Sequence, residues 1–307
     1  MTNLTKLMSQ PANEPAPATS LRQVPRRYLA LGLIIVAIVL LGALVLVRDI
    51  SGPTSTPTVE TFSAAPSSLV STVGSVPTSV YDAVGVSSPT VPVTLLHEAG
   101  NSSAPVWLAA VNGGPPQPVV FFYGAEFAPY AAVERWPLVM ALSRFGTFNQ
   151  LGLMQSSPTT AFANLSTFTF WKVSYSSRYV ILESVERYSS LNPTGARYLS
   201  LETPDARQSA AIAGYGTSTN TFSLLDVANR YVLNGAGFSP TVLAGLSQGQ
   251  IAGDLSTPAS PMTQAMVTAA NEITATICSV DGDRPAAVCE SKGVLAADQV
   301  LKITPPH

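Results

Sequence analysis

The sequence predicts an α/β domain behind a single N-terminal membrane anchor, and three observations support this. An apolar run from Pro118 to Tyr123, bounded by Pro and Gly, predicts a buried strand. A helical period from Val133 to Phe145 follows after a short loop. The last third of the chain carries several helix start signals. Strands that alternate with helices are typical of an α/β domain.

The anchor is predicted at residues 28–47, which contain no charged side chain. Twenty such residues rise about 30 Å as a helix, which is the thickness of the hydrocarbon layer. Four basic residues and one acid precede the segment, so the positive-inside rule predicts residues 1–27 as a disordered cytoplasmic tail. A cleaved signal peptide is the alternative, but the stretch ends in Val47-Arg48-Asp49 and not at a small-x-small site.

Residues 48–66 are rich in Ser, Thr and Pro and predict an extended linker. The folded domain is then expected over residues 67–307, outside the cell membrane. Without the five basic residues and one acid that precede Asp49, this exported part has 11 basic and 17 acidic side chains. It is therefore mildly acidic, in a chain of which only 11% is charged, against about 25% in an average soluble protein.

Further elements follow from periodicity and punctuation. Helical segments are predicted from Ser67 to Gly85, with Pro77 in a first turn, and from Ser239-Pro240 to Leu246. Others begin at Ser247, with Gln250 completing a capping box, and at Ser260-Pro261, ending near Cys278. Gly146 is expected to close the helix that ends near Phe145. Strands are expected at 151–156, across 168–188, and as one strand or a pair within 221–233.

The same sequence excludes several function classes. A net charge of −2 with no basic cluster argues against nucleic acid as a partner. No phosphate loop or dinucleotide fingerprint is present, so no cofactor is expected. The two histidines, His97 and His307, lack zinc-ligand spacing with the two cysteines.

One family resemblance is carried by four runs of sequence. They are FFYGAEFAPYAAVERWPLVMALSRFGTF from Phe121, VPTSVY from Val76, FSLLDVANRY ending at Tyr231, and ICSVDGDRPAAVC ending at Cys289. Together they resemble a thioredoxin-like, membrane-anchored family of archaea and actinobacteria called domain of unknown function 929. The resemblance spans about Ser68 to Cys289, and its most specific part is Glu134-Arg135-Trp136.

The resemblance implies a thioredoxin-like core with a helical C-terminal addition, and a Cys-Pro-Tyr-Cys motif at the start of the helix that follows the first strand. A helix N-terminus stabilises a thiolate, which that chemistry needs. This chain instead has Ala128-Pro129-Tyr130-Ala131. Ser223 takes the position where such folds usually place a cis-proline. We call Ala128 to Ala131 the degenerate motif, and an alanine methyl cannot attack a disulfide.

Two origins of the alanines remain open, natural loss and an engineered double substitution. Ser223 at the position of the usual cis-proline favours natural loss, because an engineered change of the two cysteines would leave the neighbouring positions intact. Glu126 and Glu134 lie near the helix start, and we expect them to complement the helix dipole on a solvated surface.

The two cysteines, Cys278 and Cys289, are an even count in an exported domain, and a structural disulfide is the natural interpretation. Gly245-Leu246-Ser247-Gln248-Gly249 matches the nucleophile elbow of serine hydrolases. Ser247 lacks the preceding strand and a suitable later histidine, so an N-cap role is the better interpretation. Asn101 and Asn164 begin formal glycosylation sequons.

The expected function is therefore a non-catalytic binding, scaffold or folding-assistance module that is held at the membrane and acts on an exported or membrane protein. A thiol-disulfide oxidoreductase, represented here by an engineered sequence, is the alternative. A serine hydrolase using Ser247 is a remote third. Because so few carboxylates are available to protonate, the exported surface is also expected to tolerate acid.

Overall fold

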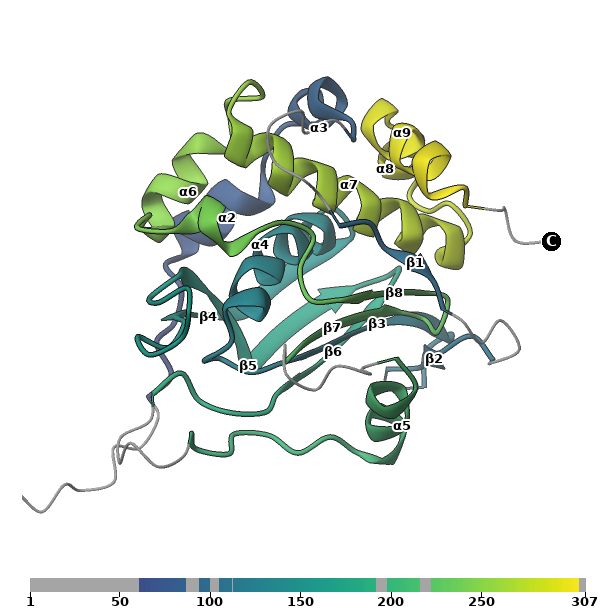
Figure 1. Ribbon diagram of the computed structural model, residues 1–307. Helices are drawn as coiled ribbons and strands as arrows, with labels where there is room; N and C mark the ends of the chain where they lie inside the picture. The colour runs from purple at the N-terminus through teal and green to yellow at the C-terminus, as the bar shows by residue number, and fades with distance from the viewer. Residues whose placement is uncertain are drawn as a thin grey trace, which may run out of the picture. The chain divides into compact units, whose positions relative to one another are not determined.

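The computed structural model describes residues 61–86, 94–99, 105–111, 113–191, 198–215 and 222–303. The predicted tail and the anchor at 28–47 lie outside these ranges. Within them, no helix is both long and apolar enough to cross a membrane. Figure 1 shows a twisted sheet with most helices layered on one face and one helix on the other.

The helices have the following bounds, with one 3-10 turn among them: α2 (Ser67–Gly74), α3 (Thr78–Val84), α4 (Pro129–Ser143), α5 (Ala206–Tyr215), η1 (Pro240–Leu243), α6 (Gln248–Asp254), α7 (Pro261–Asp281), α8 (Ala286–Cys289) and α9 (Lys292–Leu301). The strands are β1 (His97–Glu98), β2 (Leu108–Ala109), β3 (Gln117–Gly124), β4 (Gly146–Gln155), β5 (Ser166–Ser177), β6 (Ile181–Glu186), β7 (Ser223–Val227) and β8 (Tyr231–Asn234).

Strand β3 is the centre of the main sheet. It pairs in parallel with β6 on one side and antiparallel with β7 on the other. Strand β7 continues antiparallel to β8, β8 pairs with β1, and the short β2 pairs with the start of β3. Strands β4 and β5 form a long antiparallel hairpin, and β5 lies next to β6 (Figure 1).

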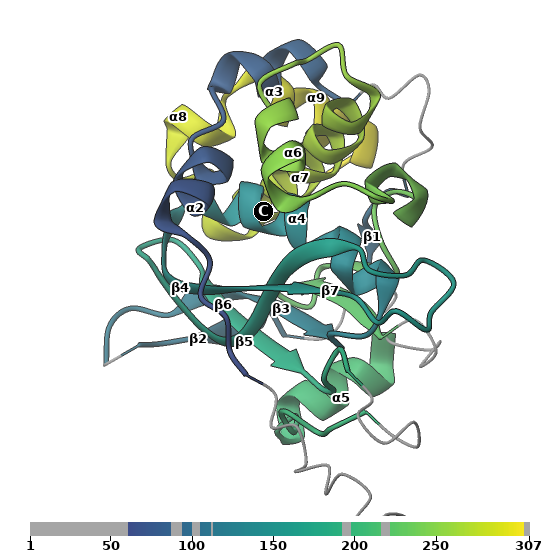
Figure 2. The same ribbon diagram turned by 90° about the vertical axis from the view of Figure 1, so that its left-hand side faces the viewer.

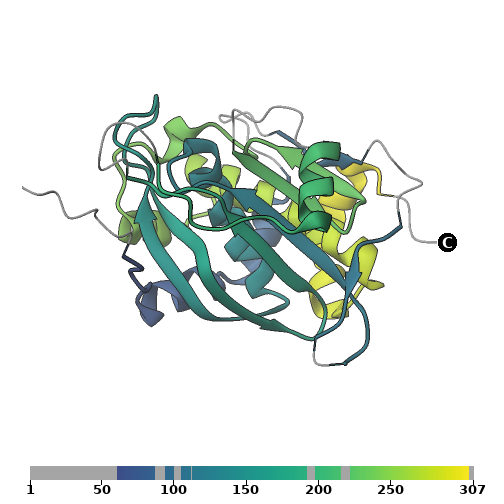
Figure 3. The same cartoon turned by 90° about the horizontal axis from the view of Figure 1, so that it is seen from below.

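The alternation of β3 explains why its sequence is apolar throughout. Val120 and Phe122 point into the large core beneath the helical layer. Val119 and Phe121 point to the opposite face, where they pack with Trp107 in a smaller core that α5 covers. Side chains alternate between the faces of a strand, so a strand covered on both sides is apolar at every position. Figures 2 and 3 show α5 on this second face.

Most predicted elements are confirmed, with corrections at their boundaries, but the helix predicted from Ser239-Pro240 to Leu246 is only a 3-10 turn, η1. The segment 67–85 forms two helices, because Pro77 caps a new helix, and Gly85 ends it with a positive φ of 59°. The capping box of Ser247 and Gln250 is present. The segment 168–188 lies in two strands, β5 and β6. The prediction that Gly146 closes a helix was wrong, because α4 ends at Ser143 and Gly146 begins β4.

Ordered structure begins before the expected boundary at residue 67. Ala64 forms an antiparallel bridge with Gly152 of β4, and the backbone amide of Ala65 donates to the carbonyl of Leu151 at 2.8 Å. Phe62 packs edge-on against Trp171, with ring centroids 6.3 Å apart. The composition of residues 63–65 does not predict this pairing. The pairing depends on hydrogen-bond partners in β4, which lies far along the chain.

Gly293 marks the closest approach between α9 and α3. A Cβ atom at this position would lie 2.4 Å from the carbonyl oxygen of Tyr81, and the Gly293 amide donates to the carboxylate of Asp82 at 2.9 Å. The contact therefore requires a residue without a side chain.

We predict that Gly293→Ala destabilises the protein by about 1–3 kcal/mol, because the helices must move apart. Gly253→Ala is the matched control, since a Cβ atom there meets nothing within 4 Å. Replacing a helical glycine at an open position is expected to stabilise by about 0.5–1 kcal/mol. Urea unfolding of the two variants measures both effects, and equal effects would contradict the close contact.

Candidate functional site

The degenerate motif lies at the carboxyl end of the central strand. Gly124, the last residue of β3, is paired with Ser223 on β7 and with Glu186 on β6. The chain then turns and enters α4 at Pro129, which occupies the first helical position. The motif is therefore at a helix N-terminus, where three strands of the sheet meet.

The two alanines of the motif are buried and the residues between them are not. Ala128 is 2% exposed and Ala131 is fully buried, whereas Tyr130 is 38% exposed. A Cβ atom built on Gly124 would lie 3.4 Å from the Ala131 methyl. The methyl groups thus fill the space beneath the loop, and neither position offers a nucleophile.

Ser223 lies beside this site, because it pairs with Gly124 at the end of β3. Its side chain is buried and its hydroxyl donates to the carbonyl oxygen of Gly235. The preceding Phe222 has a φ of 43°, which is the left-handed region and unusual for an aromatic residue. The backbone therefore bends sharply as it enters β7 beside the motif.

The prediction that Glu126 and Glu134 lie on a solvated surface was wrong. Glu126 is 2% exposed and Glu134 is fully buried. The helix that follows the motif is covered on all sides, with twelve consecutive residues buried from Ala131 to Leu142. A surface role was inferred from charge, but the surrounding layers of β5 and α7 leave no solvent at these positions.

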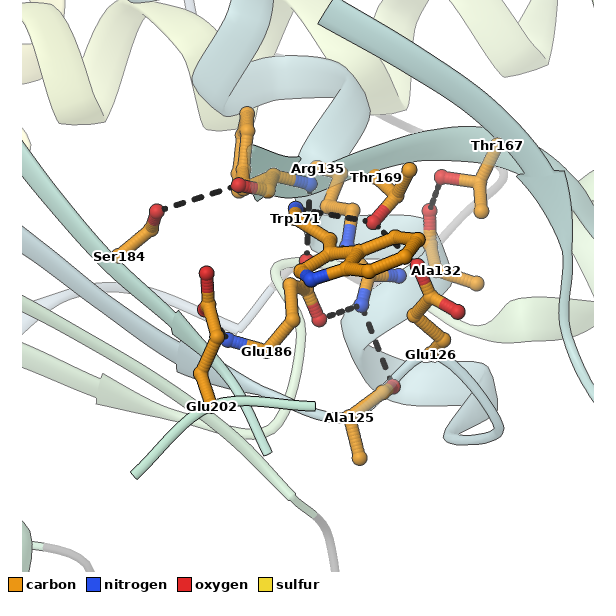
Figure 4. Close-up of polar contacts among 11 residues, drawn as sticks. Ala125, Glu126, Ala132, Arg135, Thr167, Thr169, Trp171, Ser184, Glu186 and Glu202 are labelled. Atoms are coloured by element: carbon orange, nitrogen blue, oxygen red, sulfur yellow. Dashed lines mark hydrogen bonds and ion pairs between the residues drawn. The ribbon is translucent and has the colours of Figure 1, made fainter. Parts of the chain in front are cut away.

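Arg135 is the hub of a buried polar network beneath the motif (Figure 4). Its Nε donates to Oε1 of Glu186 at 2.8 Å and its Nη2 donates to Oε2 at 2.6 Å, with both side chains fully buried. Nη2 also donates to the carbonyl oxygen of Ala125 at 3.2 Å. One side chain of α4 thereby holds both β6 and the loop that begins the motif.

Glu186 and its neighbours extend this network into the sheet. The backbone amide of Phe170 on β5 donates to Oε1 of Glu186 at 3.0 Å. The amide of Glu186 donates to the carboxylate of Glu202 at 2.6 Å. Burial raises the pKa of Glu202 to about 7, although that hydrogen bond favours its charged form. The Thr169 hydroxyl donates to the Glu126 carboxylate at 2.6 Å. This bond holds the Glu126 side chain in place beside the motif.

Five aromatic rings, each partly exposed, surround the loop before the motif. They are Tyr123, Phe127, Tyr188, Tyr198 and Phe222, and we call them the aromatic patch. Phe127 is its centre, because it stacks on Tyr198 with centroids 4.1 Å apart and meets Phe222 edge-on at 5.1 Å. The Arg187 guanidinium lies 4.8 Å from the centroid of Tyr188.

The other predicted site residues have structural roles or open surroundings. Cys278 and Cys289 form a disulfide between α7 and α8, which confirms the predicted pair. The Ser247 hydroxyl is occupied in the cap, where it accepts from the Gln250 amide and donates to that side chain. Asn164 is exposed, and Asn101 lies outside the described residues.

No group of three or more metal-ligating side chains is present among the residues that the structure describes, and His97 is exposed on β1. Sequence reasoning missed the partner of Arg135, which is 51 positions away. An arginine inside an apolar helical period was the available signal, since a buried arginine requires a partner.

We predict that Arg135→Met costs about 3–5 kcal/mol of stability, because it leaves the Glu186 carboxylate buried without its partner. A double variant, Arg135→Met with Glu186→Leu, is expected to recover part of that loss, since no isolated charge remains. Exposed Arg178 is the control, and Arg178→Met should change stability by less than about 0.5 kcal/mol. Urea unfolding measures the stability of each variant and so tests this ranking. A double variant that is less stable than Arg135→Met would refute the prediction.

Comparison with protein families gives one match. The model of the family described as Domain of unknown function (DUF929) matches residues 112–279, which cover β3, the degenerate motif, α4 and most of α7. No curated protein and no solved structure matches the chain. Because the family match covers more than half of the sequence and includes the whole site, this chain belongs to the DUF929 family.

Proposed function

We propose that the chain is a membrane-anchored, extracytoplasmic protein with a thioredoxin-like core that lacks the redox dithiol. It acts as a non-catalytic binding module that holds, or assists the folding of, an exported or membrane protein. The aromatic patch is the observation that carries this proposal, because it offers contact area beside a motif that has no reactive group.

The order of elements around the motif supports the thioredoxin-like assignment. A redox motif of that class begins a helix within a β-α-β arrangement. Here β3 leads into the motif and α4, and after the β4–β5 hairpin β6 returns parallel to β3. The β7–β8 pair lies antiparallel on the other side of β3, and Ser223 stands opposite Gly124.

The patch suits binding for a physical reason. Aromatic rings supply a large contact area and lose little conformational entropy, and their hydroxyl groups remain able to hydrogen bond. The rings of Phe127, Tyr198 and Phe222 are fixed against one another, so a partner meets a preformed surface. Cys278–Cys289 is consistent with an oxidising compartment, and the predicted anchor would hold the patch near membrane proteins.

We predict that a photoreactive phenylalanine analogue placed at Tyr198 crosslinks a discrete partner in native membranes. The same analogue at Val300, which is 44% exposed on α9, is the matched control and should give no such product. Phe222→Ala should weaken the crosslink of the Tyr198 analogue, because the ring supports Phe127. Equal products at both positions would contradict a role for the patch.

The oxidoreductase alternative requires cysteines in place of both alanines in the natural gene, and sequencing that gene at codons 128 and 131 decides it. We predict that the full-length protein does not reduce insulin. Introducing both thiols through Ala128→Cys and Ala131→Cys should yield a closed disulfide and confer exchange, because two cysteines separated by two residues at a helix N-terminus can form a disulfide and the helix end favours the thiolate. Turnover by the protein without these substitutions would refute the non-catalytic assignment.

A further inference from the structure

Two carboxyl groups are buried on α4 and α7, helices that pack together, and no salt bridge joins either group to a cation among the described residues. Glu134 of α4 and Glu272 of α7 are both fully buried. Oε1 of Glu134 and both carboxyl oxygens of Glu272 have no hydrogen-bond partner among the described residues. The Gly237 amide donates to Oε2 of Glu134 at 2.8 Å, and the backbone amide of Leu96 lies close enough to the Glu272 carboxyl to favour its charged form.

Gly237 lies close to both helices, next to Glu134 of α4 and Ala269 of α7. A Cβ atom on Gly237 would lie 3.6 Å from Oε2 of Glu134 and 2.9 Å from the Ala269 methyl of α7. Ala269 and Glu272 are three residues apart and share a face of α7. The carboxyl groups therefore occupy the contact between α4 and α7, closed by the loop that follows β8.

The two arginines nearest to the pair along α4, Arg135 and Arg144, make their hydrogen bonds to other groups, although Nη1 of Arg135 has no partner among the described residues. Arg135, the next residue of α4, bonds to Glu186. Arg144 packs 4.4 Å from the Tyr81 ring of α3 and donates to Ser291 at 2.9 Å. No ion pair joins Glu134 or Glu272 to a cation among the described residues.

Among the described residues, the further cations on elements packed against α4 and α7 are Lys172 on β5 and Lys292 on α9, and both are exposed. The other titratable groups nearby are His97 and Glu98 on β1, both exposed, Tyr231 on β8, Asp82 on α3 and Asp281 at the end of α7. The pair must therefore bear its charges uncompensated or remain protonated.

We propose that Glu134 and Glu272 form a proton-dependent lock between α4 and α7. With both carboxyl groups neutral, the two helices pack as observed, and loss of the protons loosens their contact. The lock does not depend on the function proposed for the aromatic patch. It joins the helix that begins at the degenerate motif to the helix that carries Cys278.

The direction of the pH dependence follows from burial. Burial raises the pKa of Glu134 to about 8 from 4.5, against the weaker effect of the Gly237 hydrogen bond. Burial also raises the pKa of Glu272 to about 8, against the weaker effect of the Leu96 backbone amide, and the Glu134 carboxyl adds to the rise. A folded-state pKa above the unfolded value means that protonation stabilises the fold. The stabilisation is complete below about pH 4.5 and is lost as pH rises through about 8.

The test compares the full-length protein with the double variant Glu134→Gln and Glu272→Gln, since glutamine has the shape of a protonated glutamate and does not ionise. The wild-type folding equilibrium constant is expected to fall between pH 6 and pH 9. Over the same range, the folding equilibrium constant of the double variant should fall by a factor that is smaller by about tenfold or more. A tenfold difference corresponds to one unit of difference between the folded and unfolded pKa values. Glu98→Gln is the control, because Glu98 is an exposed carboxyl on β1. This variant should show the same fall of the folding equilibrium constant as the wild type.

Infrared spectroscopy supplies a second measurement that holds if the double variant folds poorly. The wild-type protein at pH 6 should show the carbonyl band of a protonated carboxylic acid that resists exchange with solvent. The band should disappear above about pH 8 and be reduced in Glu134→Gln alone. An equal fall of stability in wild type and double variant, or the absence of the band at pH 6, would overturn the lock.

Discussion

The buried ion pair between Arg135 and Glu186 is the constraint on which the site depends. Two ions without water require several hydrogen bonds each, because the desolvation of a charge costs several kcal/mol. Here Arg135 also holds the Ala125 carbonyl, and Glu186 also holds the Phe170 amide. To satisfy these charges, α4, β5, β6 and the loop before the motif must all take one relative position (Figure 4). The geometry of the degenerate motif is a consequence of that requirement.

The three consecutive residues Glu134, Arg135 and Trp136 each fasten α4 in a different direction. Glu134 bonds to the loop after β8 and faces α7, Arg135 bonds to β6, and the Trp136 indole donates to the Ser166 carbonyl of β5 at 3.0 Å. Successive residues of a helix are rotated by about 100°, so three in a row face nearly the whole circumference. A polar group in each direction gives the packing a specificity that apolar contacts alone lack.

The sequence predicted those features that depend on local pattern. Pro77, the Ser247 capping box and the continuous apolar run of β3 act over a few residues, and the structure has all three. It did not predict the partners of buried charge. Glu126 and Glu134 were interpreted as surface groups because a charged residue is usually exposed. Their burial depends on β5 and α7, which are far away along the chain. A local sequence pattern therefore cannot predict it. The strand pairing of residues 63–65 was missed for the same reason, since β4 provides it.

The polar frame around residues 128–131 does not by itself imply a reaction at these residues. The polar network beneath the motif bonds to backbone and to its own members, and none of these bonds uses the side chain of residue 128 or 131. The network would be the same with a small thiol or a methyl at these two buried positions, because the volumes differ little and no hydrogen bond is involved. The frame persists because the fold needs it, as a buried charge cannot lose its partner cheaply. The partly exposed rings of the aromatic patch are not required in this way, and their position beside the motif is what points to binding.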